Sequence, residues 1–263
     1  MSDWFFYHLP IWVSLPVFVV VFVALSWLIL LGVRPWVQRA SAADSLQWDR
    51  VLGYAMSSYG IFYGILLGLI AVSVYENFQR INGEVLDEVE ALATLYRNTD
   101  AFPAPIAQEL SSLLATYTID VVNVDWPSQA NGVIPTAGDA TVNQIQSALY
   151  GIQPTSLGEN SIFAQTLQVW ADFQQYRRGR LEETELVLPP LLWAVVAIGS
   201  VLNALMISLV EIRSLRVHLI MAGIIATFVA LLIYTIASMD HAYAGPVSVD
   251  PEPFLDLYLE IMR

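Results

Sequence analysis

Four long stretches of this sequence contain no Asp, Glu, Lys or Arg, and they constrain the fold more than any other feature. They cover residues 11–33, 51–75, 189–210 and 219–239, so each has between 21 and 25 residues. About 20 consecutive apolar residues cross the hydrocarbon core of a bilayer as an α-helix. The sequence therefore predicts an all-α, polytopic membrane protein with four transmembrane helices in contact with the lipid bilayer.

The composition agrees with this prediction and excludes several kinds of chemistry. Apolar residues make up 56% of the 263 residues and charged residues 13%, about half the charged fraction of a typical soluble domain. All 11 basic residues are Arg, and the chain has neither Lys nor Cys. A P-loop lysine, a Schiff-base lysine, a thiolate nucleophile and a cysteine-ligated metal are therefore excluded. The net charge of −13 also argues against nucleic acid as a partner.

The sequence contains no recognisable enzyme motif. Its three histidines, His8, His218 and His241, lie near the ends of the predicted spans and far apart in the sequence. None belongs to a His-Glu-x-x-His arrangement, and there is no Gly-x-Ser-x-Gly or glycine-rich phosphate loop. We therefore expect no catalytic residues and no organic cofactor, and we do not expect an enzyme.

Four spans place both termini, the segment 76–188 and the tail 240–263 on one face of the membrane. The segment has a net charge of −10 and the tail −4, whereas the two short loops on the other face sum to +2. Basic residues near the spans are almost balanced, but the first span has Arg34 and Arg39 at its trailing end and none at its leading end. The positive-inside rule then predicts that the termini and the acidic segment are non-cytoplasmic.

The same division predicts four parts in the chain. Residues 1–75 form a first transmembrane hairpin and residues 189–239 a second one. The segment 76–188 between them forms an acidic helical domain that is continuous with the spans, and residues 240–263 form an acidic tail.

The second span is predicted to continue beyond the membrane. Apolar residues recur at steps of three and four as far as Tyr96, the period of a helix with one apolar face. We therefore expect one continuous helix over residues 51–98. Its polar face supplies an acidic vestibule made of Glu76, Glu84, Asp87, Glu88 and Glu90.

The rest of the acidic segment also has helical periodicity and no alternating β pattern. One helix follows the prolines at 103 and 105 and is expected to end at Trp126 and Pro127. A short helix is expected to be capped by Asp139. A last helix starts at about Ser161 and is expected to continue into the third span.

The second span also carries a stripe of small residues at steps of three and four, a pattern that lets two helices approach closely. Its members are Gly53, Ser57, Gly60, Gly64, Gly68 and Ala71. The stripe either packs inside one subunit, or packs against a neighbouring subunit and surrounds a narrow axis. In the second case Tyr59, Phe62 and Tyr63 are candidates for a hydrophobic gate.

Carboxylates in the tail lie among turn-forming residues, and they include Asp240, Asp250 and Glu252. Oxygen ligands on a constrained loop suit Ca²⁺, although the spacing is not that of an EF-hand. The alternative is a solvated acidic tail without a metal.

Two blocks of sequence resemble a known family. One comprises GILLGLIAV at 64–72, YENF at 75–78 and EALATLYR at 90–97; the other comprises MDHAYAG at 239–245 and VDPEPF at 249–254. Taken together, they resemble the bestrophin-like family of bacterial four-span membrane proteins, a domain of unknown function. His241-Ala242-Tyr243 departs from the Pro-Phe that is usual after the tail aspartate.

The resemblance implies a distant relation to the bestrophins, which are pentameric ion channels whose second span lines the pore. It implies a homo-oligomer that conducts inorganic ions, and it makes Asp250 and Glu252 candidates for a Ca²⁺ clasp after the fourth span. The bestrophin domain between the spans is cytoplasmic, which is opposite to the orientation predicted above. The alternative function is a non-conducting membrane scaffold or sensor whose acidic domain binds a partner or a divalent cation.

Overall fold

The computed structural model describes residues 9–40, 45–245 and 247–263, and it is helical throughout with no strand in these ranges. The chain divides into two compact units. The first, the membrane unit, comprises Met1–Glu76 and Val187–Asp240, and the second, the helical unit, comprises Asn77–Leu186 and His241–Arg263. The all-α prediction is confirmed.

Four helices are long and apolar enough to cross a membrane, as the sequence predicts. Helix α2 covers Ile11–Ala40, α3 covers Ser45–Asn98, α8 covers Pro190–Ser208 and α9 covers Leu215–Met239. The predicted continuous helix over residues 51–98 is confirmed, and it begins six residues earlier than expected.

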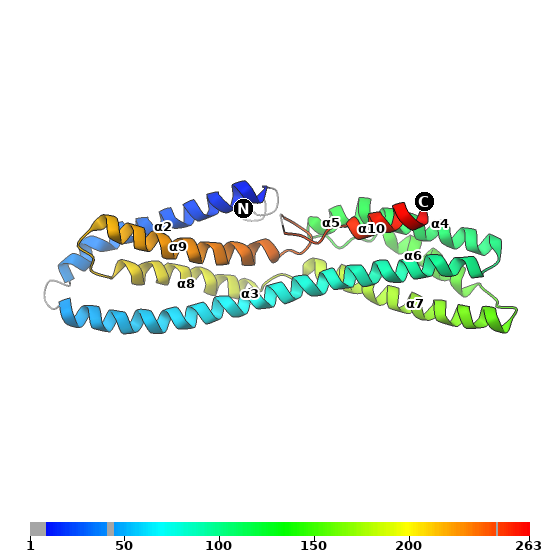
Figure 1. The fold of residues 1–263 in the computed structure, drawn as a ribbon, viewed down its shortest axis with the longest axis horizontal. Helices are drawn as coiled ribbons and strands as arrows, with labels where there is room; N and C mark the ends of the chain where they lie inside the picture. The colour runs from blue at the N-terminus through cyan, green and yellow to red at the C-terminus, as the bar shows by residue number, and fades with distance from the viewer. Residues whose placement is uncertain (1–8, 41–44, 246) are drawn as a thin grey trace. The chain divides into compact units, whose positions relative to one another are not determined.

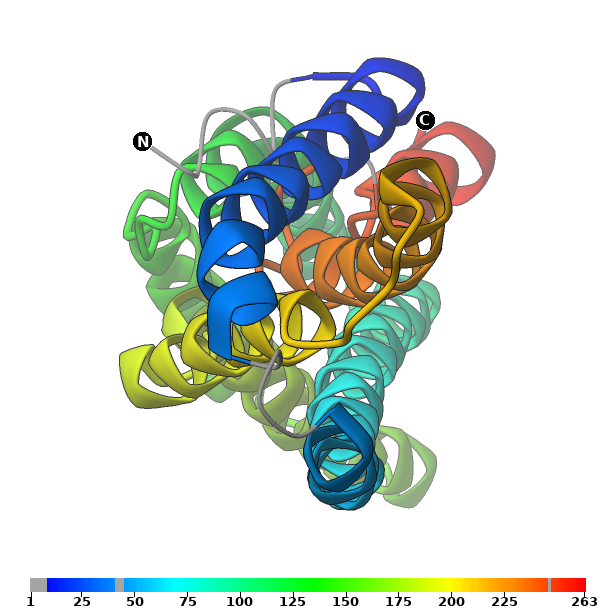
Figure 2. The ribbon, with the colours of Figure 1, turned by 90° about the vertical axis from the view of Figure 1, so that its left-hand side faces the viewer.

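Within the membrane unit, α2 packs along α9 and also contacts α8. Figure 1 shows α2 and α9 side by side, and Figure 2 shows the first part of α3 outside the group formed by α2, α8 and α9. A buried hydrogen bond of 2.6 Å joins Ser14 Oγ of α2 to the Tyr234 hydroxyl of α9. Asp240 at the end of α9 accepts hydrogen bonds from the Leu188 amide at 2.7 Å and from Trp193 Nε1 at 3.0 Å.

The helical unit contains the second half of α3 and five further α-helices. These are α4 (Ala104–Asp120), α5 (Trp126–Ala130), α6 (Gly138–Tyr150), α7 (Leu157–Glu182) and α10 (Glu252–Leu257). Five residues of π-helix, Val121–Asp125, join α4 to α5, and five more, Tyr258–Met262, follow α10. The short 3₁₀ segments Thr99–Ala101 and Glu183–Glu185 follow α3 and α7.

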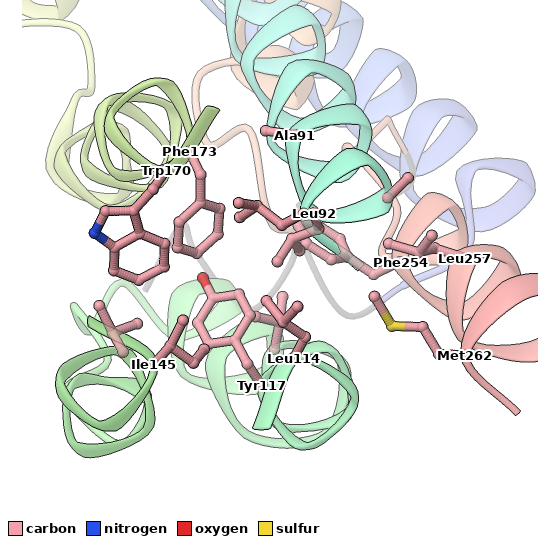
Figure 3. Packing of buried hydrophobic residues seen from close by; sticks show 14 of the residues in the cluster. Ala91, Leu92, Leu114, Tyr117, Ile145, Trp170, Phe173, Phe254, Leu257 and Met262 are labelled. Carbon is pink, nitrogen blue, oxygen red and sulfur yellow. The ribbon is translucent and has the colours of Figure 1, made fainter. Parts of the chain in front are cut away.

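The core of this unit gathers side chains from all of its long helices and from the tail. Figure 3 shows Tyr117 of α4 and Phe173 of α7 lying together, with Phe254 of α10 also part of the cluster. The rings of Tyr117 and Phe173 meet edge to face, with centroids 5.3 Å apart. Phe254 is fully buried, so the tail is an integral part of the core instead of a separate solvated segment.

Three predicted boundaries are wrong. Trp126 and Pro127 do not end a helix, because the chain continues through the π segment Val121–Asp125 into α5. Asp139 does not cap α6 with its side chain, since Ala137 is the N-cap residue. The helix expected from Ser161 is α7, which begins at Leu157 and stops before the prolines at 189 and 190, so it does not continue into the third span.

Candidate functional site

The small-residue stripe of α3 is open in this subunit. A Cβ atom added at Gly53, Gly60, Gly64 or Gly68 would meet no described atom within 4 Å outside its own helical backbone. Ser57 on the same face is exposed, and Ala71 at the end of the stripe is half-buried. The structure therefore does not support the interpretation that these glycines pack inside one subunit.

A neighbouring face of α3 makes the contacts within the subunit. Tyr63 is buried, and its hydroxyl donates to the Val196 carbonyl at 3.0 Å and lies 2.8 Å from Ser200 Oγ. Tyr59 donates a hydrogen bond to the Gly199 carbonyl, and its ring stacks on that of Tyr63 with centroids 5.5 Å apart. The structure supports a role for both tyrosines in helix packing, because both are held on α8 of the same chain.

Phe62 has a different environment from the two tyrosines. Its side chain is 72% exposed, on a third face of α3 that also carries the exposed side chains of Ile65 and Leu69. The first half of α3 therefore presents one face to its own subunit, an uncovered stripe of small residues, and an uncovered face of bulky apolar residues. The role of Phe62 in gating stays a prediction.

The predicted vestibule residues separate into two groups. Glu76, Asp87 and Glu90 are exposed, whereas Glu84 is half-buried and Glu88 has no exposed surface. The assignment of Glu88 to an accessible acidic face is wrong. It lies in helical register with the buried residues Val85 and Leu92, so it points into the core of the helical unit.

Glu88 is one member of a buried polar network centred on Arg180 of α7. Arg180 Nε donates to Glu88 Oε2 at 2.7 Å, and its Nη2 donates to Asp125 Oδ2 at 3.2 Å. Arg180 Nη1 donates to Gln129 Oε1 at 2.5 Å, and the Tyr117 hydroxyl donates to Glu88 Oε1 at 2.6 Å. Glu88, Asp125 and Arg180 of this network are all at most 1% exposed, so their interactions are with buried groups of the protein and not with bulk water.

A second ion-pair cluster lies beside the first one. Arg80 of α3 binds Glu183 and also approaches Glu84 Oε1 at 3.4 Å. The Glu84 carboxylate lies against Gly179 of α7, where a Cβ would come within 2.1 Å of Glu84 Oε2. Burial raises the pKa of Glu84, and the nearby negative charge of Glu183 raises it further, while Arg80 opposes both. A side chain at position 179 would therefore require this carboxylate to move.

The tail carboxylates are not gathered into a cluster among the described residues. No group of three or more His, Asp or Glu side chains that could hold a metal ion occurs among the residues that the structure describes. Asp250 and Glu252 are exposed. Both oxygens of Asp240 accept hydrogen bonds from the protein. Ca²⁺ binding therefore stays a prediction from sequence, without support from the geometry.

Sequence reasoning missed the buried network because it grouped residues by charge rather than by helical register. A signal was present at Glu88, since an acidic residue between Val85 and Leu92 occupies a core position of an amphipathic helix. A second signal was Arg180, which follows the buried Phe173 by seven residues on α7. Asp125 carried no such signal, because its burial depends on the π-helical turn that precedes Trp126.

Comparisons with known proteins agree with this architecture. The family model of the Bestrophin-like domain matches residues 20–254. A search of curated proteins found no match.

Among solved structures, a single-substitution variant of a bacterial Bestrophin homolog from Klebsiella pneumoniae has a TM-score of 0.63 at 12% identity, over 92% of this chain and 96% of that chain. A second variant of a Klebsiella pneumoniae Bestrophin homolog has a TM-score of 0.61 at 13% identity, over 95% and 98% of the two chains. A structure described as a membrane protein variant has a TM-score of 0.62 at 12% identity, over 94% and 99%. At this level of identity, the likeness concerns the fold.

Proposed function

This chain belongs to the bestrophin-like family, and on that premise we propose that it forms an oligomeric ion channel, with α3 around a central axis and an acidic vestibule. The observation that carries the proposal is the open stripe of α3. Tyr59 and Tyr63 attach α3 to its own subunit, and the stripe that contains Gly60, Gly64 and Gly68 has no described partner outside its own helix.

The stripe suits contact with a second copy of the same helix better than contact with lipid. Glycines on one face let two helix backbones approach closely, and the resulting packing is a main source of helix association in membranes. The homo-oligomer therefore places equivalent α3 helices next to one another. The ion path runs along the axis that these helices surround, as the resemblance to the bestrophins implies.

The vestibule is formed by the exposed carboxylates of Glu76, Asp87 and Glu90, now without Glu88. The segment 76–188 that contains them has a net charge of −10. A mouth lined by one sign of charge raises the local concentration of counter-ions. We infer that this vestibule concentrates inorganic cations near the path.

The test of this proposal is ion flux through liposomes that contain the purified full chain, together with the mass of the assembly in detergent. Gly64→Leu should dissociate the assembly or block flux, because a bulky side chain prevents close approach of the stripe. Ile65→Leu is the matched control, since it places a leucine one residue away, on the exposed bulky face, and should leave mass and flux unchanged.

Two results would contradict the channel. A chain that is monomeric in liposomes and detergent would remove the oligomer and its axis. A correctly assembled oligomer that passes no ion of either sign would instead favour the non-conducting scaffold or sensor.

The non-cytoplasmic placement of the acidic segment in a bacterial inner membrane has its own test. The sequence contains no Cys, so single-cysteine variants can be labelled without background. Ser112→Cys in α4 and Ser214→Cys before α9 are both at exposed positions. We expect a membrane-impermeant thiol reagent added to intact spheroplasts to label position 112 and not position 214; the reverse pattern would place the acidic segment in the cytoplasm.

A further inference from the structure

The buried network of the helical unit contains two carboxylates and one guanidinium. Glu88, Asp125 and Arg180 are all at most 1% exposed. If both carboxylates were ionised, this core would carry one uncompensated negative charge. Burying a charge without a partner costs several kcal/mol or more, so such a group usually takes up a proton instead.

The hydrogen bonds distinguish the two carboxylates. Glu88 uses both of its oxygens as acceptors, because Oε2 accepts from Arg180 Nε at 2.7 Å and Oε1 accepts from the Tyr117 hydroxyl at 2.6 Å. Among the described residues, Asp125 accepts one side-chain hydrogen bond, from Arg180 Nη2 to Oδ2 at 3.2 Å. Its other oxygen, Oδ1, is buried without a hydrogen-bond partner. The protein therefore donates hydrogen bonds to both carboxylate oxygens of Glu88, but to only one carboxylate oxygen of Asp125.

Glu88 of α3 and Arg177 and Arg180 of α7 act on the charge of Asp125. Two tyrosines are linked to it indirectly: the Tyr117 hydroxyl of α4 accepts from the same Arg180 Nη2 at 3.2 Å, and Tyr243 of the tail packs on the adjacent Trp126. Arg180 is shared with Glu88, and Arg177 forms an ion pair of 2.6 Å with the more exposed Asp139. Burial raises the pKa of Asp125; Arg180 and Arg177 lower it, and burial outweighs them.

Asp125 occupies a position from which its charge can affect the tail. It is the last residue of the π-helical segment Val121–Asp125, and single π-helical turns of this kind are frequent at functional sites. The next residue, Trp126, donates from Nε1 to the Val249 carbonyl at 3.1 Å. The Trp126 ring also packs edge to face on Tyr243 and Phe254, with centroids 5.4 and 5.8 Å away.

We propose that Asp125 is a proton-binding switch that controls how firmly the tail residues 243–245 and 247–254 are held in the helical unit. The proton binds to Oδ1, which makes Asp125 neutral and leaves Glu88 and Arg180 as a balanced pair. Loss of this proton leaves a second negative charge in the core, beside Trp126. This charge favours opening of the tail, because Asp125 is in contact with water in the open state. Acid therefore holds the tail closed, and higher pH releases it.

The direction follows from proton linkage. A carboxyl that binds its proton more tightly in the closed state than in the open state stabilises the closed state at low pH. This stabilisation is lost as the pH rises through the pKa of the closed state. Within that range, one proton changes the opening equilibrium by up to about tenfold per pH unit.

The test is hydrogen–deuterium exchange of the full chain in detergent, read on peptides from the tail and corrected for the intrinsic effect of pH. In the wild type, opening of the tail should increase as the pH is raised across the range in which the protein stays folded. Asp125→Asn, which mimics the protonated side chain, should hold the tail closed and remove this pH dependence. Asp87→Asn, on the exposed face of α3, is the matched control and should behave as the wild type.

Infrared spectroscopy supplies a measurement that does not depend on tail opening. The carbonyl stretch of a protonated carboxyl group should be present in the wild type at a pH at which the tail is closed, unchanged in Asp87→Asn and lost in Asp125→Asn. The proposal is overturned if Asp125→Asn leaves this band or the pH dependence of exchange unchanged. It is also overturned if Asp125→Asn opens the tail at both ends of the pH range, because Asp125 would then act as an ionised partner of Arg180. None of these readouts involves ion flux, so the outcome is independent of the proposed channel.

Discussion

Tyr63 of α3 lies against Gly199 of α8 so closely that a Cβ atom at position 199 would come within 2.2 Å of the Tyr63 ring. The Tyr63 hydroxyl then reaches the Val196 carbonyl, one turn earlier on α8. This contact is where α3 is attached to its own subunit, and it depends on the absence of a side chain at position 199.

Replacement of Gly199 should therefore separate α3 from α8. We expect Gly199→Ala to lower the free energy of unfolding by about 1–3 kcal/mol, as overpacking in a close-packed interior does. Thermal unfolding of the full chain in detergent measures this loss. Gly32→Ala on α2, where an added Cβ would meet no described atom within 4 Å, is the control and should have little effect. If the two changes lowered the free energy of unfolding equally, the contact between Tyr63 and Gly199 would not be a specific source of stability.

Loss of Arg180 should be more damaging than loss of any exposed arginine. Arg180→Met leaves Glu88 and Asp125 buried without their cation, and breaking a buried ion pair in this way costs about 3–5 kcal/mol. Arg178→Met, two residues earlier on the exposed side of α7, should change the stability by less than about 1 kcal/mol. Chemical unfolding of both variants measures the difference, and similar stabilities would contradict the central role of Arg180.

The tail should contribute to stability through Phe254. This side chain is fully buried among Trp126 and Arg180, whereas its neighbour Leu255 is 39% exposed. Phe254→Ala should cost about 3–5 kcal/mol, within the range for a buried phenylalanine. Leu255→Ala should cost much less. Limited proteolysis should cut the tail of the first variant faster, and a tail that is equally resistant in both variants would show that Phe254 does not anchor it.

High pH should destabilise the helical unit through its buried tyrosines. Burial raises the pKa of Tyr243, and the carboxylates of Glu88 and Glu183 raise it further, against the opposing effect of Arg180. A group with a raised pKa in the folded state supplies stability that is complete below its ordinary pKa of about 10 and is lost as the pH rises through the raised value. The folded protein should therefore lose stability above about pH 10.

Tyr243→Phe tests this pH dependence. It should lower the stability at neutral pH by about 1 kcal/mol, because the hydrogen bond from the Tyr243 hydroxyl to the Arg180 carbonyl is lost. It should also make the loss of stability above pH 10 less steep. Tyr150→Phe, at a position that is 62% exposed, is the control. If both variants had the same slope in alkaline unfolding, Tyr243 would not be the titrating group.

Features that depend on long runs of residues could be predicted from the sequence. The four spans follow from stretches of 21–25 residues without a charge, and the continuation of α3 to Asn98 follows from one apolar face kept over several turns. For the stripe of α3, the sequence left two packing partners open: a helix of the same subunit or a helix of a neighbouring subunit. The spacing of Gly60, Gly64 and Gly68 indicates that some helix can approach, and it does not indicate from which chain that helix comes.

Features that depend on contacts between residues far apart in the sequence could not be predicted from the sequence. Tyr59 and Tyr63 were candidates for a gate until α8 supplied the carbonyls that accept their hydrogen bonds. Glu88 was placed with the accessible carboxylates, and the structure buries it against Arg180, which is 92 positions away. The end of α7 also differed from the prediction, because the helix stops at Glu182 and the third span is a separate helix that begins at Pro190.

The sequence by itself determined that this chain is an all-helical protein with four spans, that its negative charge lies outside them, and that its motifs resemble one family. These are properties of periodicity and composition, which each helix carries within its own residues. Only the tertiary structure decided which carboxylates are accessible and which are buried, and it did so through contacts between α3, α7 and the tail. The physical reason is that the free energy of a charge depends on what surrounds it, and residues far apart in the sequence supply those surroundings.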